Sequence, residues 1–192
     1  MAIELKCISK AFGDKQVLAD FSLVLERGIT CIMGASGKGK TTIVNLLAGL
    51  IDADRGNINI PSGTKFSFVF QEDRLLEWES ALTNVLFVTE NPKKNTARAV
   101  DLLSQADLGS SINKKAKELS GGMKRRVAIC RALIADYDII ILDEPFKGLD
   151  STIKPGIIDM VKNHTVGKYV LAITHDLYEA EYLGGKLINL DL

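Results

Sequence analysis

The chain has 192 residues, of which 46% are apolar, and its 24 Lys and Arg residues are balanced by 24 Asp and Glu residues. This content suffices for one sizeable core, and the balanced charge argues against a strongly basic nucleic-acid-binding protein. No apolar run approaches the roughly 18 residues of a membrane-spanning helix, and the first residues lack the pattern of a signal peptide. We therefore expect a single domain over residues 1–192 that stays in the cytoplasm.

Two alternating segments at the start, residues 2–8 and 17–26, predict strands of a small antiparallel sheet. Later apolar runs rich in Ile, Val and Phe suit strands buried on both faces of a mainly parallel sheet. These runs are residues 29–33, 66–70, 139–142 and 169–174. Helical stretches are expected at residues 41–49, 96–106, 121–135 and 153–163. This alternation predicts an α/β fold, with a helical subdomain at about residues 78–135, where no convincing strand occurs.

The cysteines give no sign of disulfides or metal binding. Cys7, Cys31 and Cys130 are odd in number, far apart and surrounded by apolar neighbours, so we expect three reduced core residues. His164 falls in a polar stretch that indicates an exposed loop, and we assign it no role.

A glycine-rich loop joins the strand at 29–33 to the next helix. The segment GASGKGKTT fits the phosphate-loop pattern at Gly34, Gly39, Lys40 and Thr41. Glycines, Gly37 among them, let main-chain N–H groups surround phosphate oxygens, and the helix start adds its positive dipole end. Lys40 is expected to bind the β and γ phosphates, and the Thr41 hydroxyl to coordinate Mg²⁺. A chance glycine-rich turn is the alternative, and the strand–loop–helix setting argues against it.

The rest of the loop belongs to the same candidate nucleotide site, a P-loop NTPase core. The Thr42 hydroxyl is expected to donate to the α phosphate. The other predicted nucleotide-binding positions are Ala35, Ser36 and Lys38.

Acidic residues follow a second buried strand, in the segment DIIILDEP. Ligands of open α/β sheets bind where parallel strands end, which places Asp143 and Glu144 at the site. Asp143 is expected to orient Mg²⁺, and Glu144 to polarise the water that attacks the γ phosphate. The alternative is a pair of acids that merely end a strand. His175 follows the strand at 169–174 and, by the same geometry, would sense the γ phosphate.

The segment LSGGMKRRVAIC begins a helix in an unusual way. Ser120 suits the N-cap, but Gly121 and Gly122 each weaken a helix by about 1 kcal/mol relative to alanine. An apolar face of Met123 and Val127 explains the helix without explaining its glycines.

These segments together resemble the ATP-binding-cassette (ABC) ATPases, the nucleotide-binding subunits of ABC transporters. The resemblance covers nearly the whole chain and follows the family's order of motifs. These are Phe12, GASGKGKTT, Gln71 in FVFQEDRLL, LSGGM, IIILDEP, residues 148–150 and THD.

The resemblance implies a head-to-tail dimer in which ATP lies between the phosphate loop of one chain and the LSGG loop of the other. Ser120, Gly121 and Gly122 would then contact the γ phosphate held by the partner, which accounts for the glycines. It also implies that Phe12 stacks on adenine. Gln71 would approach Mg²⁺ and the attacking water, and Asp150 would contact the partner's phosphate loop.

Some positions depart from the family pattern. Met123 stands where glutamine is usual, and Lys147 and Gly148 stand where small or hydroxyl residues are common. Only 30 residues separate Lys40 from Gln71, and 17 follow His175. We therefore expect a minimal cassette with a trimmed N-terminal sheet and no regulatory domain.

The implied function is an ATPase subunit that dimerises around two ATP and drives solute transport through a membrane permease. It would be peripheral on the cytoplasmic face of the membrane, and soluble when expressed alone. A soluble ABC ATPase with a non-transport partner is the alternative. A cassette that binds ATP without hydrolysing it is disfavoured because Glu144 and His175 are both present.

The segment QEDRLLEWESALTNV is similar to importer ATPases for nitrate, sulfonate and taurine. The similarity implies that Leu75, Leu76 and Trp78 form an exposed apolar patch for a permease helix. Packing of Leu75 and Leu76 within the helical subdomain is the alternative. A basic cluster is expected to be a solvated helix face rather than a nucleic-acid site, since it has no interleaved aromatics. It comprises Lys114, Lys115, Lys117, Lys124, Arg125 and Arg126.

Overall fold

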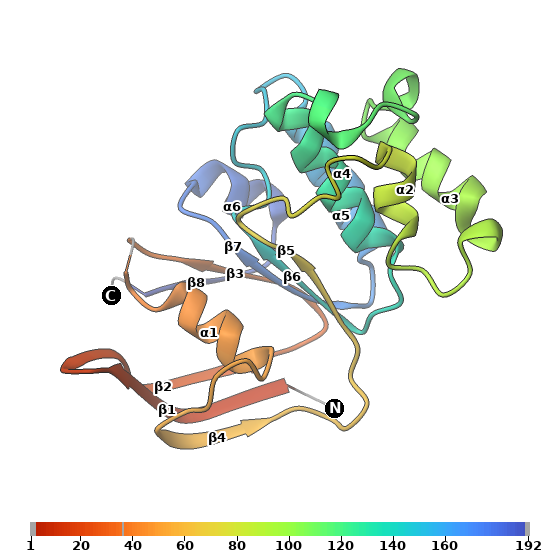
Figure 1. The fold of residues 1–192 in the computed structure, drawn as a ribbon. Helices are drawn as coiled ribbons and strands as arrows, with labels where there is room; N and C mark the ends of the chain where they lie inside the picture. The colour runs from red at the N-terminus through yellow and green to blue at the C-terminus, as the bar shows by residue number, and fades with distance from the viewer. Residues whose placement is uncertain (1–2, 36, 191–192) are drawn as a thin grey trace.

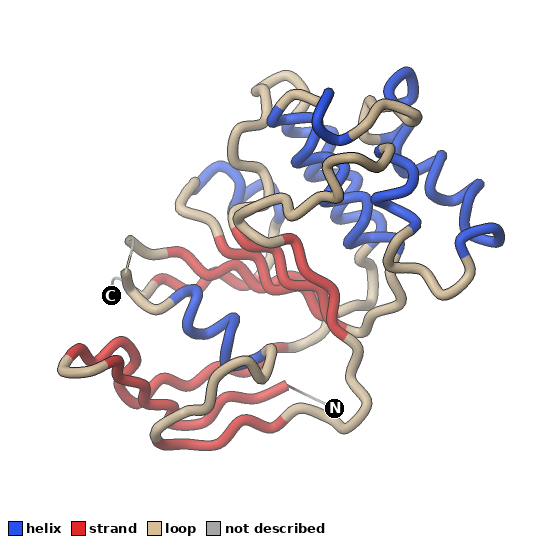
Figure 2. Tube along the Cα trace, viewed as in Figure 1, coloured by secondary structure: helices blue, strands red, loops and turns tan. Residues whose placement is uncertain are grey.

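The structure is a computed structural model that describes residues 3–35 and 37–190. A three-stranded antiparallel sheet and a five-stranded parallel sheet lie on either side of helix α1, and the other helices lie beyond the parallel sheet (Figures 1 and 2). The strands are β1 (Ile3–Phe12), β2 (Lys15–Leu25), β3 (Gly28–Met33), β4 (Arg55–Asn59), β5 (Phe66–Val69), β6 (Ile139–Asp143), β7 (Tyr169–Ile173) and β8 (Lys186–Asn189). The helices are α1 (Lys40–Leu47), α2 (Ala81–Leu86), α3 (Pro92–Gln105), α4 (Gly121–Ile134), α5 (Lys154–His164) and α6 (Leu177–Leu183), with 3-10 turns at Gly109–Ser111 and Ala116–Glu118. This arrangement confirms the predicted fold class.

The parallel sheet has the strand order β5-β6-β7-β3-β8, and all of its neighbouring pairs are parallel. The carboxyl ends of its strands therefore share one edge. The segments that follow β3, β5, β6 and β7 meet at this edge. These four connections carry the phosphate loop, Gln71, Glu144 and His175.

The core has two parts, one on each face of the parallel sheet. Successive residues of β6 alternate between them: Ile139 and Ile141 pack on the α1 side, and Ile140 and Leu142 pack on the side of α2 to α5. Both faces are buried, so the strand is apolar throughout, as its sequence predicted.

Four elements were not expected from the sequence. β4 and β8 are short polar strands at sheet edges, where one side needs no partner, so they lack an apolar signature. α2 and α6 have only 6 and 7 residues, too few for a helical period to stand out. Residues 78–135 form α2, α3, α4 and both 3-10 turns, and their described β pairing is one isolated bridge between Ser80 and Lys115.

The cysteine prediction is wrong for Cys7, which is exposed, whereas Cys31 and Cys130 are buried. Cys7 has a φ of 51° and lies where the β1–β2 register shifts, so a bulge turns its side chain outward. Burial raises the pKa of the Cys31 thiol to about 11 and that of Cys130 to about 12. His164 is also not in a loop: it ends α5, is half-buried, and its Nε2 lies 3.0 Å from Oε1 of Gln105.

Among the described residues, no helix combines the length and the apolar character that a membrane-spanning segment requires.

Candidate active site

A cavity of about 580 Å³ opens at the carboxyl edge of the parallel sheet. It brings together most of the residues that the sequence predicted as a site. Those that line it are Phe12, Gly34, Ala35, Gly37, Gly39, Lys40, Thr41, Thr42, Gln71, Asp143, Glu144 and His175. Ser36 falls outside the described residues, and Lys38 does not line the cavity.

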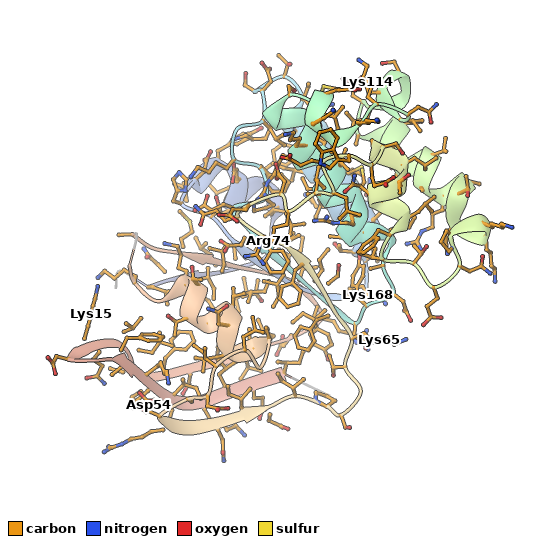
Figure 3. All side chains as sticks on the ribbon, viewed as in Figure 1. Lys15, Asp54, Lys65, Arg74, Lys114 and Lys168 are labelled. Atoms are coloured by element: carbon orange, nitrogen blue, oxygen red, sulfur yellow. The ribbon has the colours of Figure 1, made fainter. Side chains whose placement is uncertain are left out.

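Lys15 and Val17 also line the cavity, although they belong to no motif that would have predicted this position. They lie at the start of β2, and Lys15 extends from the β1–β2 hairpin (Figure 3). A Cβ atom on Gly37 would be 3.9 Å from Nζ of Lys15, so the Lys15 ammonium lies close to the phosphate loop. Phe12 ends β1 beside them and is 51% exposed, which leaves its ring open to a planar ligand.

The phosphate loop begins α1 with a glycine that no other residue could replace without strain. Gly39 has a φ of 90°, and a Cβ atom there would lie 2.8 Å from Leu18 Cδ2. As the N-cap it offers no side chain to the first N–H groups of α1, which have no acceptor within the helix. This helix start is therefore suited to an anion.

Lys40 places its ammonium inside the curve of the loop. Its Nζ donates to the carbonyl oxygens of Gly34, at 2.5 Å, and Ala35, at 2.8 Å. Thr41 is exposed and Thr42 is buried on the next position of the helix. A cation, the main-chain N–H groups of a helix start and a hydroxyl thus belong to residues that line one cavity, which fits a nucleotide phosphate chain.

Asp143 ends β6 and faces the same cavity. Burial, and then the neighbouring charge of Glu144, raise the pKa of Asp143, while Arg125 and Lys40 act in the opposite direction. A cation bound beside Asp143 would stabilise the ionised form of its carboxyl group, which burial and Glu144 disfavour. The described residues contain no cluster of three or more acidic, His or Cys side chains that would hold a metal alone. Thr41 and Asp143 are hard oxygen donors, and they fit Mg²⁺, which keeps water and phosphate oxygens among its ligands.

Glu144 is held in an unusual conformation directly after β6. Its φ is 48°, in the left-handed region, and its N–H donates to the carbonyl of Ile173 at 2.9 Å. Its side chain is only 13% exposed, against 63% for that of His175. Nδ1 of His175 lies 2.8 Å from each carboxylate oxygen of Glu144. The structure therefore brings together two side chains that the sequence placed on different strands.

Ser120 caps α4 as predicted, and its Oγ accepts from the N–H of Met123 at 3.3 Å. A Cβ atom on Gly121 would meet nothing within 4 Å, and one on Gly122 would come no closer than 3.4 Å to the carbonyl of Gly148. Packing within this chain therefore does not require glycine at position 121. None of these three residues lines the cavity.

Asp150 is exposed and lies outside the cavity as well. Its Oδ1 accepts from the main-chain N–H of Thr152 at 2.9 Å and from its hydroxyl at 2.7 Å. These hydrogen bonds hold the pKa of Asp150 below its usual value. Lys147, one of the positions that depart from the family pattern, does line the cavity.

The prediction of a solvated basic face is wrong for Arg125 and Arg126, which are 4% and 7% exposed. Arg125 donates to main-chain carbonyls next to Gln71 and Glu144. The sequence prediction missed the buried position of Arg125 because it considered the positive charge of the whole cluster and not the helical spacing of its members. Both arginines lie four residues before apolar positions of the helix, Ile129 and Cys130, so helical periodicity turns them inward.

The segment after Gln71 is partly exposed. Leu76 and Trp78 are 40% and 69% exposed, and Nζ of Lys117 lies 3.8 Å from the centroid of the Trp78 ring. Leu75 is half-buried and packs on the core. Leu75 therefore packs within the fold, as the alternative interpretation expected, whereas Leu76 and Trp78 are exposed, as the docking interpretation expected.

A groove of about 910 Å³ runs beside the edge strand β5. Phe87 and Val88, which follow α2, line it and are 67% and 43% exposed. The guanidinium of Arg74 lies 4.2 Å from the centroid of the Phe70 ring on the same wall (Figure 3).

Comparison with known proteins gives consistent matches. A family model described as ABC transporter matches residues 18–147. An aliphatic sulfonates import ATP-binding protein of Burkholderia cenocepacia is 34% identical over 199 residues, covering 98% of this chain and 73% of the relative. A taurine import ATP-binding protein of Pseudomonas fluorescens is 37% identical over 188 residues, covering 91% of this chain and 71% of the relative.

Two solved structures are similar over nearly the full length. One is a dimeric structure of MJ0796, a bacterial ABC transporter cassette, with a TM-score of 0.84 at 30% identity. The other is a dimeric post-hydrolysis state of MJ0796 bound to ADP and Pi, with a TM-score of 0.85 at 30% identity. Each comparison covers 97% of this chain and 93% of the other.

Proposed function

Since the chain belongs to the ABC transporter family of ATP-binding ATPase subunits, we propose that two copies enclose two ATP molecules and drive solute import through a membrane permease. The whole chain acts as one ATPase domain, with residues 78–135 as its helical part. One observation carries the proposal. Lys40, Asp143, Glu144 and His175 meet in one cavity, while Gly121 at the start of α4 faces no packing constraint in its own chain.

ATP binds along the phosphate loop in this proposal. The exposed ring of Phe12 stacks on adenine, and Lys40 and the N–H groups of α1 bind the phosphates. Thr41, Asp143 and Gln71 hold Mg²⁺, which supplies charge neutralisation at the phosphates. Thr42 donates to the α phosphate.

Glu144 is the general base for the attacking water. Its carboxylate lies against His175, so the imidazole and the base are positioned together. An ionised carboxylate can only accept, which makes Nδ1 of His175 the donor. Nε2 then donates to a γ-phosphate oxygen when the ring is the imidazolium, in which both nitrogens carry a proton.

A second copy completes each site. Ser120, Gly121 and Gly122 present an exposed helix start to the γ phosphate of the partner's ATP, and Asp150 contacts the partner's phosphate loop. Two observations support this: a side chain at position 121 would meet nothing in the same chain, and both similar MJ0796 structures are dimeric.

The permease docks beside β5, on the cytoplasmic face of the membrane. Leu76 and Trp78 after β5, and Phe87 and Val88 after α2, are exposed apolar residues, and exposed apolar patches mark interaction surfaces. The named relatives import aliphatic sulfonates and taurine, both of which carry a sulfonate group. We propose a solute of that class, which the permease selects rather than this subunit.

The variant Glu144→Gln tests the proposal. It keeps the hydrogen-bonding shape but removes the base, so ATP is bound and not consumed. We expect size-exclusion chromatography with Mg-ATP to give a dimer, and ATPase activity to fall by roughly 10²-fold or more. Glu26→Gln, at an exposed site after β2, is the control that keeps wild-type turnover. Monomer alone under these conditions, or full activity, contradicts the proposal.

A further inference from the structure

We propose that Arg125 is a positioning residue for hydrolysis, which fixes the main chain at Glu144 and at Gln71. This inference rests on the proposed function, because that function is what assigns Glu144 and Gln71 to the catalytic step. Arg125 lies in the second turn of α4, five residues after Ser120.

The Arg125 guanidinium is buried and uses every nitrogen. Nε donates to Pro145 O at 2.9 Å, Nη2 to Asp143 O at 2.7 Å and Glu144 O at 2.6 Å, and Nη1 to Phe70 O at 2.5 Å, Gln71 O at 3.4 Å and Asp73 Oδ1 at 3.1 Å. All but one of these acceptors are main-chain carbonyls of two loops. A single planar group therefore joins the loop after β6 to the loop after β5.

The carbonyls on both sides of Glu144 are held by this one side chain. Glu144 has a left-handed φ of 48°, a conformation that non-glycine residues keep only where surrounding contacts enforce it. The peptide oxygens of residues 143, 144 and 145 all point to Arg125. Without these bonds, the Glu144 carboxylate loses the main-chain geometry that directs it to His175.

A lysine cannot replace this arrangement. An ammonium is a compact point charge with three donors, whereas the acceptors of Arg125 are spread around a planar fork. Arg125→Lys keeps the positive charge and the aliphatic stem but releases some of the carbonyls in both loops. The geometry of the base then relaxes while the phosphate loop, which Arg125 does not contact, is unchanged.

Arg126 provides a matched control on the same helix. It is similarly buried, and it donates to the carbonyls of Ala106, at 2.6 Å, and Asp107, at 3.1 Å. Its remaining contacts are the Asp107 carboxylate at 3.5 Å and the carbonyl of Gly122, one turn earlier, at 3.4 Å. Arg126→Lys therefore disturbs a buried guanidinium without touching either catalytic loop.

The test measures ATP binding and turnover separately in Arg125→Lys and Arg126→Lys. Equilibrium binding of a fluorescent ATP analogue gives the Kd, and steady-state phosphate release gives kcat. We expect Arg125→Lys to lower kcat on the order of 10- to 100-fold, as small misplacements of catalytic groups do, with the Kd changed less than about twofold. Arg126→Lys is expected to keep kcat within about twofold of wild type at a similar loss of melting temperature.

Other outcomes overturn the inference. Wild-type kcat in Arg125→Lys, an equal loss of kcat in both variants, or a loss explained by weaker ATP binding each assigns Arg125 a structural role only. If Arg125→Lys does not fold, Arg125→Gln is measured by the same criteria. An inactive wild-type protein defeats the proposed function itself, whereas an active wild type with an equally active Arg125→Lys defeats only the role of Arg125.

Discussion

Glu144 and His175 form a direct contact between two neighbouring strands, with Nδ1 of the imidazole 2.8 Å from both oxygens of the carboxylate. The parallel pairing of β6 with β7 creates this contact, because it aligns Asp143 with Ile173 and so brings the residues just beyond them together. The proposed base and the proposed phosphate sensor thus form a single hydrogen-bonded unit.

This contact predicts that His175→Ala lowers hydrolysis more than it lowers binding. The substitution frees the Glu144 carboxylate and removes the proposed Nε2 contact to the γ phosphate. We expect kcat to fall by roughly 10²-fold, within the range of general acid–base effects, with the Kd for ATP changed only slightly. Phosphate release and analogue binding measure the two quantities, and a variant with full turnover contradicts the prediction.

The glycine at position 121 predicts a trade between stability and activity. Because a Cβ atom there meets nothing within 4 Å, Gly121→Ala is expected to stabilise the free chain, by at most the roughly 1 kcal/mol that applies in a helix interior. In the proposed dimer the same methyl group occupies the face that meets the partner's phosphate, so Mg-ATP-dependent dimerisation and ATPase activity are expected to fall. Thermal unfolding and size-exclusion chromatography measure the two effects.

The control for this substitution is Gly156→Ala in α5. Gly156 is also helical and exposed, and a Cβ atom there would meet nothing within 4 Å. The Gly156→Ala substitution is therefore expected to raise stability similarly while leaving dimerisation and turnover unchanged. A Gly121→Ala variant as active as Gly156→Ala removes the reason for placing a phosphate at the start of α4.

Trp78 predicts an optical signal for permease docking. It is the single tryptophan of the chain and is 69% exposed, so the tryptophan emission of this chain reports the surroundings of Trp78. Docking is expected to shift the emission to shorter wavelength. Trp78→Ala is expected to weaken co-purification with the permease by about tenfold or more, as loss of a central aromatic anchor does, and to leave ATP binding intact.

Leu187→Ala is the control for the docking surface. Leu187 is 48% exposed on β8, at the edge of the sheet opposite β5. The Leu187→Ala variant is therefore expected to bind the permease normally. Equal association of the Trp78→Ala and Leu187→Ala variants with the permease rules out docking through Trp78.

The three cysteines predict an uneven reaction with a maleimide at pH 8. A raised thiol pKa leaves less thiolate at a given pH, and burial raises the pKa of Cys31 to about 11 and of Cys130 to about 12. Cys7 is exposed and is expected to be the one site labelled rapidly in the native protein. Mass spectrometry counts the adducts: Cys7→Ser should abolish the fast reaction, and denaturation should expose all of the thiols. A second fast adduct in the native protein contradicts the buried positions.

The sequence predicted the site well where chemistry depends on local pattern. The phosphate loop and the acids after 139–142 were found because each motif follows a buried strand, and parallel strands bring such positions to one edge. What it could not give were interactions between distant segments. The six bonds of Arg125 reach across 18 to 55 positions of the chain, and no local pattern records them. Likewise, the outward turn of Cys7 follows from a register shift between two strands rather than from its apolar neighbours.

The guanidinium of Arg125 joins the start of helix α4 to the loop after β6, which carries the proposed base Glu144. In the proposed dimer, the first turn of this helix touches the nucleotide belonging to the other subunit. In that dimer α4 connects two nucleotide sites. A change in the nucleotide of one site is then transmitted through α4 to the loop that holds Glu144 in the other site. The proposed coupling between the paired pockets thus depends on the five-residue spacing of Ser120 and Arg125 at the start of one helix.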